Sequence, residues 1–418
     1  MPTDHNIRHR YWETKNLWNR RRESTCTSHQ RIGHYQAAMK DNNFSWFFFQ
    51  RGEVPAISGY SPKRHRECVD LVIMKKKATY GLKAQRKLGI VNTEFNNNNK
   101  IIAQSISTHS RKLGTIAKEK FATKGSASID QIITNRCYID HNHSQKKSFA
   151  LISVDLEGCY DIILHLAAAL ALFSIGIPHA RIHSMFESIQ KMIHRIRTAF
   201  GDSDIMYRGE DIGDWVNKPQ GVLQGNTAGS DIWSALSSVK FKLLHSRGFA
   251  ENIVTAVSKQ VLTLVGFVYV DDCGLIQSVN NPINVLAYMQ SLINSWGSLM
   301  EVTGGAVRAD KSWWYMIDYV WKRGKRVASD PQLNIDLVAT NTNGESVTLS
   351  HLRSDEAAEM VGVWLAPSGD NNKIIKVLKT AAVKWGGESK LIKAGGLDCP
   401  TLQHFCQIKI SFTSMYPL

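Results

Sequence analysis

The most informative stretch of the chain is Leu262-Thr-Leu-Val-Gly-Phe-Val-Tyr-Val-Asp-Asp-Cys-Gly-Leu-Ile276. Two apolar runs, rich in branched and aromatic side chains, flank Tyr269-Val-Asp-Asp272, and each has the length of a buried strand. The pattern predicts a hairpin with Asp271 and Asp272 at its tip. Acidic residues are common at turns, so the hairpin alone does not define a function.

A further carboxylate ends another strand-like segment, Phe149-Ala-Leu-Ile-Ser-Val-Asp155. This short apolar run predicts a buried strand that delivers Asp155 at its carboxyl end. If that strand neighbours the hairpin, Asp155, Asp271 and Asp272 form a set of hard oxygen ligands suited to two Mg²⁺ ions, which nucleotidyl transfer requires. We expect Mg²⁺ as the cofactor, with Mn²⁺ as a substitute.

Composition indicates a globular protein of two or three lobes, because the chain has 418 residues of which 43% are apolar. We expect no membrane span and no secretory signal, and therefore an intracellular protein, nuclear or cytoplasmic. The seven cysteines are scattered and odd in number, and the 15 histidines lack ligand spacing. These patterns predict neither a disulfide framework nor a structural metal.

The net charge of +15 is unevenly distributed. Residues 1–150 contain 27 Lys and Arg against 11 Asp and Glu, whereas residues 151–418 contain 24 against 25. A basic amino-terminal region suits a polyanion, because phosphate contacts supply most non-specific affinity for nucleic acid. Charge alone leaves an ordinary solvated surface equally open.

The remaining pattern predicts an α+β fold, with helices packed on one face of an antiparallel sheet. Short helices are expected at 44–49 and 68–74, and longer helices at 162–173, 226–245 and 371–385. A further helix is expected to follow Pro178 and to run to about Phe200, and further strands are expected at 313–319 and 360–365.

Taken together and in order, five segments resemble the motifs of reverse transcriptases, particularly those of non-LTR-type retroelements. They are Val154-Asp-Leu-Glu-Gly-Cys-Tyr-Asp161 (motif A), Pro219-Gln-Gly-Val-Leu-Gln-Gly-Asn-Thr227 (motif B), Tyr269-Val-Asp-Asp272 (motif C), Gly304-Gly-Ala-Val-Arg-Ala-Asp-Lys311 (motif D) and the primer-grip segment Met360-Val-Gly-Val363. Upstream, Lys87-Leu-Gly-Ile-Val-Asn-Thr-Glu-Phe-Asn96 and Phe121-Ala-Thr-Lys-Gly125 resemble the two fingers motifs.

The resemblance implies a right-hand polymerase fold and an RNA-directed DNA polymerase that uses an RNA template, a DNA primer and dNTPs. It implies a loosely ordered basic tail over 1–30, a basic and mostly helical amino-terminal extension with fingers over 31–148, a palm with inserted fingers helices over 149–365 and a partial thumb over 366–418. The implied roles are metal ligands for Asp155, Asp271 and Asp272, a general acid for Lys311, nucleotide contacts for Tyr160, Gln224, Gly225, Lys124 and Lys87, and the primer grip for Val361 and Gly362.

Two departures from the family leave alternatives open. Leu223 stands where relatives of this kind usually have a basic residue, and Lys124 stands where a fingers arginine would contact the triphosphate, so the bidentate phosphate contact is lost. One alternative is an inactive, retroelement-derived nucleic-acid-binding protein. The other, which does not depend on these departures, is a viral-type RNA-directed RNA polymerase, because that class shares the palm and also places carboxylates around motif A, as Asp155 and Asp161 could. Its motif B would begin with Ser-Gly, and its hairpin usually reads Gly-Asp-Asp.

Overall fold

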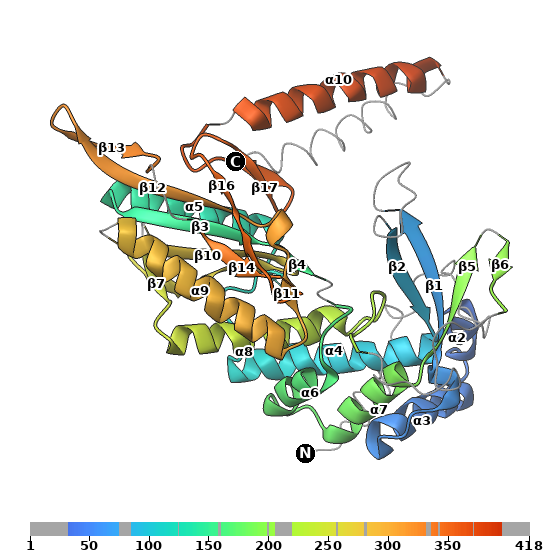
Figure 1. Cartoon of the computed structure of the whole chain (residues 1–418). Coiled ribbons are helices and arrows are strands. Elements are labelled where there is room, and N and C mark those ends of the chain that lie inside the picture. The colour runs from blue at the N-terminus through green and yellow to red at the C-terminus, as the bar shows by residue number, and fades with distance from the viewer. Residues whose placement is uncertain are drawn as a thin grey trace. The chain divides into compact units, whose positions relative to one another are not determined.

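The structure is a computed structural model that describes residues 32–74, 85–123, 125–157, 160–198, 200–204, 220–255, 258–279, 282–331, 336–341, 343–370 and 372–394 (Figure 1). The chain divides into two compact units, each built from separate stretches of sequence. Unit 1 comprises residues 1–117, 158–240 and 301–305, and unit 2 comprises residues 118–157, 241–300 and 306–418. The tail expected over 1–30 lies outside the described residues, and the other domain boundaries stay predictions.

Unit 1 combines helices with a mixed sheet. Its elements are α2 (Ile32–Ala38), α3 (Asn42–Ser58), η2 (Lys63–His65), β1 (Glu67–Met74), β2 (Gln85–Val91), α4 (Thr93–Leu113), α6 (His165–Ser174), α7 (His179–Gln190), β5 (Ile193–Thr198), β6 (Gly201–Asp202) and most of α8 (Gly229–Ser246).

The unit 1 sheet has the strand order β2-β1-β5-β6. β1 pairs antiparallel with β2 and parallel with β5 (Figure 1). The helix predicted at 68–74 is therefore wrong, and so is the helical continuation to about residue 200, because α7 ends at Gln190 and β5 follows. Both segments carry β-branched residues that pack well on a pleated surface, and each strand pairs with the other over a long sequence separation.

A buried acidic residue anchors α4 within unit 1. Asn92 caps the helix by accepting a hydrogen bond from the Glu94 backbone nitrogen at 2.9 Å. The Glu94 carboxylate is 1% exposed and binds Arg64 at 2.5 Å and Arg51 at 3.1 Å. Burial raises the pKa of Glu94, but the neighbouring His65 and the two guanidinium groups lower it by more, so that the resulting pKa is about 2. The helix end is thus fixed by a compensated buried charge.

Unit 2 contains most of the strands of the described chain. Its elements are α5 (Ser128–Gln145), β3 (Ser148–Val154), β4 (Leu156–Glu157), β7 (Glu251–Val254), β8 (Val261–Leu264), β9 (Gly266–Tyr269), β10 (Asp272–Val279), most of α9 (Pro282–Val302), β11 (Ala306–Val307), η4 (Ala309–Lys311), β12 (Trp313–Lys322), β13 (Lys325–Ser329), β14 (Val338–Thr340), β15 (Ser346–Thr348), β16 (Ser350–Leu352), β17 (Ala358–Met360), β18 (Val363–Leu365) and α10 (Asn372–Ala394).

The main sheet of unit 2 has the order β13-β12-β3-β10-β9, and these neighbours pair antiparallel. α5 covers the face that carries Phe149 and Leu151, and these residues share one buried cluster with Tyr138 of that helix (Figure 1). The hydroxyl of Tyr138 lies 2.9 Å from the Gln277 carbonyl oxygen. Ala150, on the other face of β3, is also fully buried. β3 is therefore a central strand enclosed on both faces, which gives its carboxyl end a rigid support.

Candidate active site

Asp155 follows the last residue of β3, as the sequence pattern predicts. Its backbone nitrogen donates to the Ser312 hydroxyl at 3.1 Å, and its carbonyl oxygen accepts from the Arg308 backbone nitrogen at 2.9 Å. Ser312 is in turn held by its hydroxyl, which donates to the Arg308 carbonyl oxygen at 2.8 Å. The loop before β12 thus fixes the backbone of Asp155, while its side chain remains 33% exposed.

Asp271 and Asp272 lie at the tip of the β9–β10 hairpin. Tyr269 pairs with Asp272, so Val270 and Asp271 form a two-residue turn. Val270 has φ of +57°, a conformation that β-branched residues seldom adopt and that is often found at functional sites. At the base of the hairpin the two strands approach so closely that a Cβ on Gly266 would overlap the Gly274 carbonyl oxygen.

The pairing of β10 with β3 determines which carboxylates become neighbours. In this antiparallel register Cys273 lies opposite Val154. One further step along both strands sets Asp272 opposite Asp155, where β3 ends and β10 begins. The three predicted metal ligands therefore belong to this one end of the unit 2 sheet.

The electrostatics of this end of the sheet favour a cation. Desolvation, followed by repulsion from Asp271, Asp155 and Glu359, raises the pKa of Asp272 to about 6. Desolvation also raises the pKa of Asp155, assisted by Asp271 and opposed by Lys311 and Arg308. Clustered carboxylates whose charged forms are disfavoured gain most from a bound divalent ion.

Lys311 supplies positive charge beside the carboxylates. It ends the short helix η4, and its ammonium nitrogen lies 3.6 Å from Asp155 Oδ2. The lysine side chain is 54% exposed, so it can move towards a bound substrate. The nearby pair between Arg308 and Asp310, at 2.9 Å, occupies the other charged groups of this segment.

Val361 and Gly362 form the turn between β17 and β18. Both have positive φ, +51° and +80°, as a type I′ hairpin requires. Met360, which precedes the turn, accepts a hydrogen bond at its sulfur from Asn135 Nδ2 at 3.0 Å. Its terminal methyl group packs over Gly274 of β10. This hairpin is therefore seated on the strand that begins with Asp272.

The predicted nucleotide contacts on motifs A and B lie in unit 1. The Tyr160 carbonyl oxygen accepts from the Val222 backbone nitrogen at 2.7 Å, and Gln224 Nε2 donates to Asp161 Oδ2 at 2.9 Å. Gly225 has φ of +121°, and a Cβ there would overlap the Gly89 carbonyl oxygen. Unit 1 therefore brings Tyr160, Gln224 and Gly225 together.

The fingers residues give a less complete result. Lys87 is half-buried on β2, where it pairs with Val72 of β1. Lys124 lies outside the described residues. Sequence reasoning assigned no role to three residues that support or face the carboxylates, namely Arg308, Ser312 and Glu359. Only Arg308 could have been found from the sequence, because it lies within the motif D segment.

Comparison with known proteins adds little at the level of sequence. No protein-family model matches the chain, and no curated protein matches it. Among solved structures, it is similar to an apo telomerase from Candida tropicalis truncated from its C-terminal domain, with 12% sequence identity and a TM-score of 0.40. The match covers 69% of this chain and 56% of the telomerase chain, so this chain spans little more than half of that one. The site residues therefore carry the functional assignment.

None of the described helices combines the length and apolar character that crossing a bilayer requires.

Proposed function

We propose that the chain is an RNA-directed DNA polymerase of retroelement type, which adds dNTPs to the 3′ hydroxyl of a DNA primer on an RNA template. The register of β3 with β10 carries the proposal, since it sets Asp155 opposite Asp272 and the adjoining turn adds Asp271. Three carboxylates at the end of a buried central strand and at the adjoining exposed turn sit on the rigid support that nucleotidyl transfer requires.

The donor set fits Mg²⁺, because carboxylate oxygens are the hard ligands this ion prefers. Desolvation, followed by repulsion between the carboxylates, raises the pKa of Asp272, and a bound cation would offset both. Asp155, Asp271 and Asp272 would hold the metal. When bound, two such ions activate the 3′ hydroxyl as a nucleophile and neutralise charge on the leaving pyrophosphate.

The remaining groups of unit 2 act around these carboxylates. Lys311 carries a proton beside Asp155, and we assign to it protonation of the leaving pyrophosphate. The Val361-Gly362 turn presents backbone groups to the primer strand, and its seat on β10 keeps it in a fixed position relative to Asp272.

The groups of unit 1 select and orient the nucleotide. Tyr160 provides a bulky ring against C2′ of the sugar, which leaves no room for a 2′ hydroxyl. Gln224 and Gly225 line the template base and incoming nucleotide, and Lys87 and Lys124 supply positive charge to the triphosphate. We favour a DNA polymerase over an RNA polymerase, because motif B contains Gln-Gly where an RNA polymerase would have Ser-Gly and because the hairpin reads Tyr-Val-Asp-Asp and not Gly-Asp-Asp.

The decisive experiment measures incorporation of dTTP on poly(rA) primed with oligo(dT), in the presence of Mg²⁺ or Mn²⁺. The parent chain should extend the primer. Asp271→Asn should lose on the order of a hundredfold or more in rate, because a ligand is removed without a change of side-chain shape. Asp355→Asn is the matched control, since Asp355 is a half-exposed residue of the same unit paired with Arg353.

Binding of the template-primer, followed by fluorescence anisotropy, separates lost chemistry from lost affinity. Both variants should bind as tightly as the parent. No extension by the parent with either ion would overturn the proposal and leave an inactive nucleic-acid-binding protein. Equal activity of Asp271→Asn and the parent would remove the metal assignment, and preferential use of UTP would indicate an RNA polymerase.

A further inference from the structure

A second group of potential metal ligands lies in unit 1, apart from the carboxylates of unit 2. Cys68 and Asp70 are two residues apart on β1, so their side chains lie on the same face of the sheet. His194 lies on β5, directly opposite Cys68 in the parallel register. All three are at most 1% exposed.

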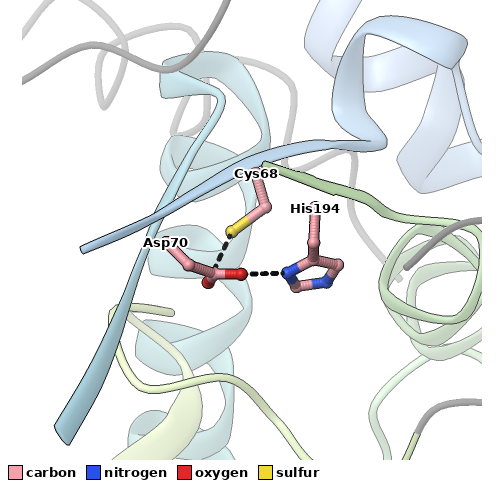
Figure 2. A group of neighbouring side chains, drawn as sticks. All are labelled: Cys68, Asp70 and His194. Carbon is pink, nitrogen blue, oxygen red and sulfur yellow. Dashed lines mark hydrogen bonds and ion pairs between the residues drawn. The ribbon is translucent and has the colours of Figure 1, made fainter. Parts of the chain in front are cut away.

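The three side chains converge on one another (Figure 2). Asp70 stands between its two partners, with Oδ2 2.7 Å from His194 Nδ1 and Oδ1 3.6 Å from Cys68 Sγ. One potential ligand atom from each residue lies within 4.8 Å of the others. In a tetrahedral zinc site, metal–ligand bonds of about 2.0 to 2.3 Å separate the ligand atoms by roughly 3.3 to 3.6 Å, so small side-chain adjustments bring these donors to that spacing.

The neighbouring strand contributes a glycine at this point. Gly89 of β2 pairs with Asp70, and a Cβ there would lie 3.1 Å from Cys68 Sγ and 3.6 Å from Asp70 Oδ1. The absence of that side chain keeps the thiol and the carboxylate uncrowded from the β2 side.

The hydrogen-bond arrangement does not suit a nucleophilic cysteine. In a thiol–imidazole pair the histidine accepts the thiol proton, whereas here Cys68 donates to Asp70 and His194 contacts the other carboxylate oxygen. The thiol is also fully buried, which prevents access by a substrate.

We propose that Cys68, Asp70 and His194 bind one divalent transition-metal ion, Zn²⁺. A thiolate, an imidazole and a carboxylate are the ligands that zinc takes, whereas Mg²⁺ prefers oxygen ligands alone. On binding, the sulfur–metal bond forms, the thiol proton leaves to solvent, and the ion replaces the hydrogen bonds that now join Cys68 and His194 to Asp70.

The ion would link strands that are distant in sequence and support a functional loop. It would tie β1 to β5, and the same region of β2 holds the loop of motif B, because Gly89 donates its backbone N–H to the Gln224 carbonyl oxygen at 2.8 Å. The proposed role is therefore structural, and metal binding can be measured whether or not the chain has polymerase activity.

The full chain, expressed with added zinc and dialysed against a weak chelator, should retain about one zinc ion per molecule by mass spectrometry of the metal. Replacement of zinc by Co²⁺ should give the absorption band of a thiolate bound to cobalt. Less than about a tenth of an equivalent of metal in the parent, together with no cobalt band, would overturn the proposal and leave a hydrogen-bonded packing cluster.

Two variants assign the site to these residues. Cys68→Ser should abolish the cobalt band and weaken zinc affinity by at least about tenfold, whereas Cys137→Ser, at an exposed cysteine of unit 2, should leave both unchanged. Asp70→Asn keeps the side-chain shape and provides a second test if Cys68→Ser does not fold. Retention of the parent's metal by folded Asp70→Asn, or its loss from Cys137→Ser, would assign the metal elsewhere and overturn the proposal. Asp271→Asn should keep its zinc, which separates this site from the polymerase carboxylates.

Discussion

Replacement of Gly225 by alanine tests whether the shape of the motif B loop supports catalysis. Gly225 has φ of +121°, which costs an L-residue about 1 to 3 kcal/mol of folding free energy. The added Cβ would also overlap the Gly89 carbonyl oxygen. Since ordinary carbon contacts lie at about 3.5 to 4 Å, relief of this overlap requires the loop to move by between about 1 and 2 Å.

That displacement should affect activity more than stability. The loop carries Gln224, whose carbonyl oxygen accepts from the Gly89 N–H at 2.8 Å and whose amide donates to Asp161 at 2.9 Å. A misplacement of about 1 Å in a catalytic arrangement can cost on the order of a hundredfold in rate. Gly225→Ala should therefore lower the single-turnover rate of primer extension by about that factor.

Gly248→Ala provides a matched control. Gly248 also has positive φ, +83°, but no atom lies within 4 Å of the added Cβ. It should lose about 1 to 2 kcal/mol in urea unfolding and keep its rate within about twofold. If Gly225→Ala extends primers as fast as the parent does, the loop is not constrained by Gly89 and the argument fails. If both variants slow equally, backbone strain rather than the overlap is responsible.

Tyr160→Val should admit ribonucleotides, so that the preference for dTTP over UTP falls by about 5- to 150-fold, the equivalent of a steric cost of 1 to 3 kcal/mol. An unchanged preference would remove Tyr160 from sugar selection. Lys311→Leu should slow single-turnover extension by about 10² to 10⁴-fold if the lysine is the general acid, whereas an unchanged rate would make it a surface residue. Glu94→Gln should destabilise unit 1 by about 2 to 3 kcal/mol at pH 7, because two cations lose their buried partner. The folded pKa of Glu94, about 2, lies below the ordinary value of 4.5, so this stabilisation is complete above about pH 4.5 and is lost as the pH falls towards 2. In urea unfolding, the difference in free energy of unfolding between Glu94→Gln and the parent should shrink by more than half between pH 7 and pH 3. The control Glu187→Gln, at a pair with Lys191, should change the free energy of unfolding by less than about 1 kcal/mol. A difference for Glu94→Gln that does not depend on pH would contradict the charge assignment.

Local sequence signals identified the central strands but not their long-range partners. The runs around Asp155 and Asp272 could be recognised because buried strands are short, apolar and ended by turns, and the structure confirms both. The sequence predicts a helix over 68–74 because its apolar residues do not alternate strictly with polar ones. In the structure, three consecutive residues of β1, Cys68 to Asp70, are buried, so the segment lacks the alternation of a half-exposed strand. Its partner β5 lies more than a hundred residues away, and no local pattern encodes that pairing.

The candidate site shows the same division. Which residues carry carboxylates could be predicted, but the adjacency of Asp155 and Asp272 depends on a register that only the folded sheet defines. Spacing rules also predicted no structural metal. The proposed zinc ligands depart from that expectation because Cys68 and His194 meet across paired strands and leave no short motif.

The β3–β10 register also determines where the gene can change in length. Insertion of one codon within β3 would turn every later side chain of that strand to the opposite face and remove Asp155 from Asp272. An insertion at the Arg323-Gly324 turn, which joins β12 to β13 at an exposed tip, leaves the register of β3 with β10 unchanged. Descendants of this sequence should therefore vary freely in the distance between motifs and keep constant length within them, so that common ancestry becomes unrecognisable by overall identity long before the arrangement of carboxylates is lost.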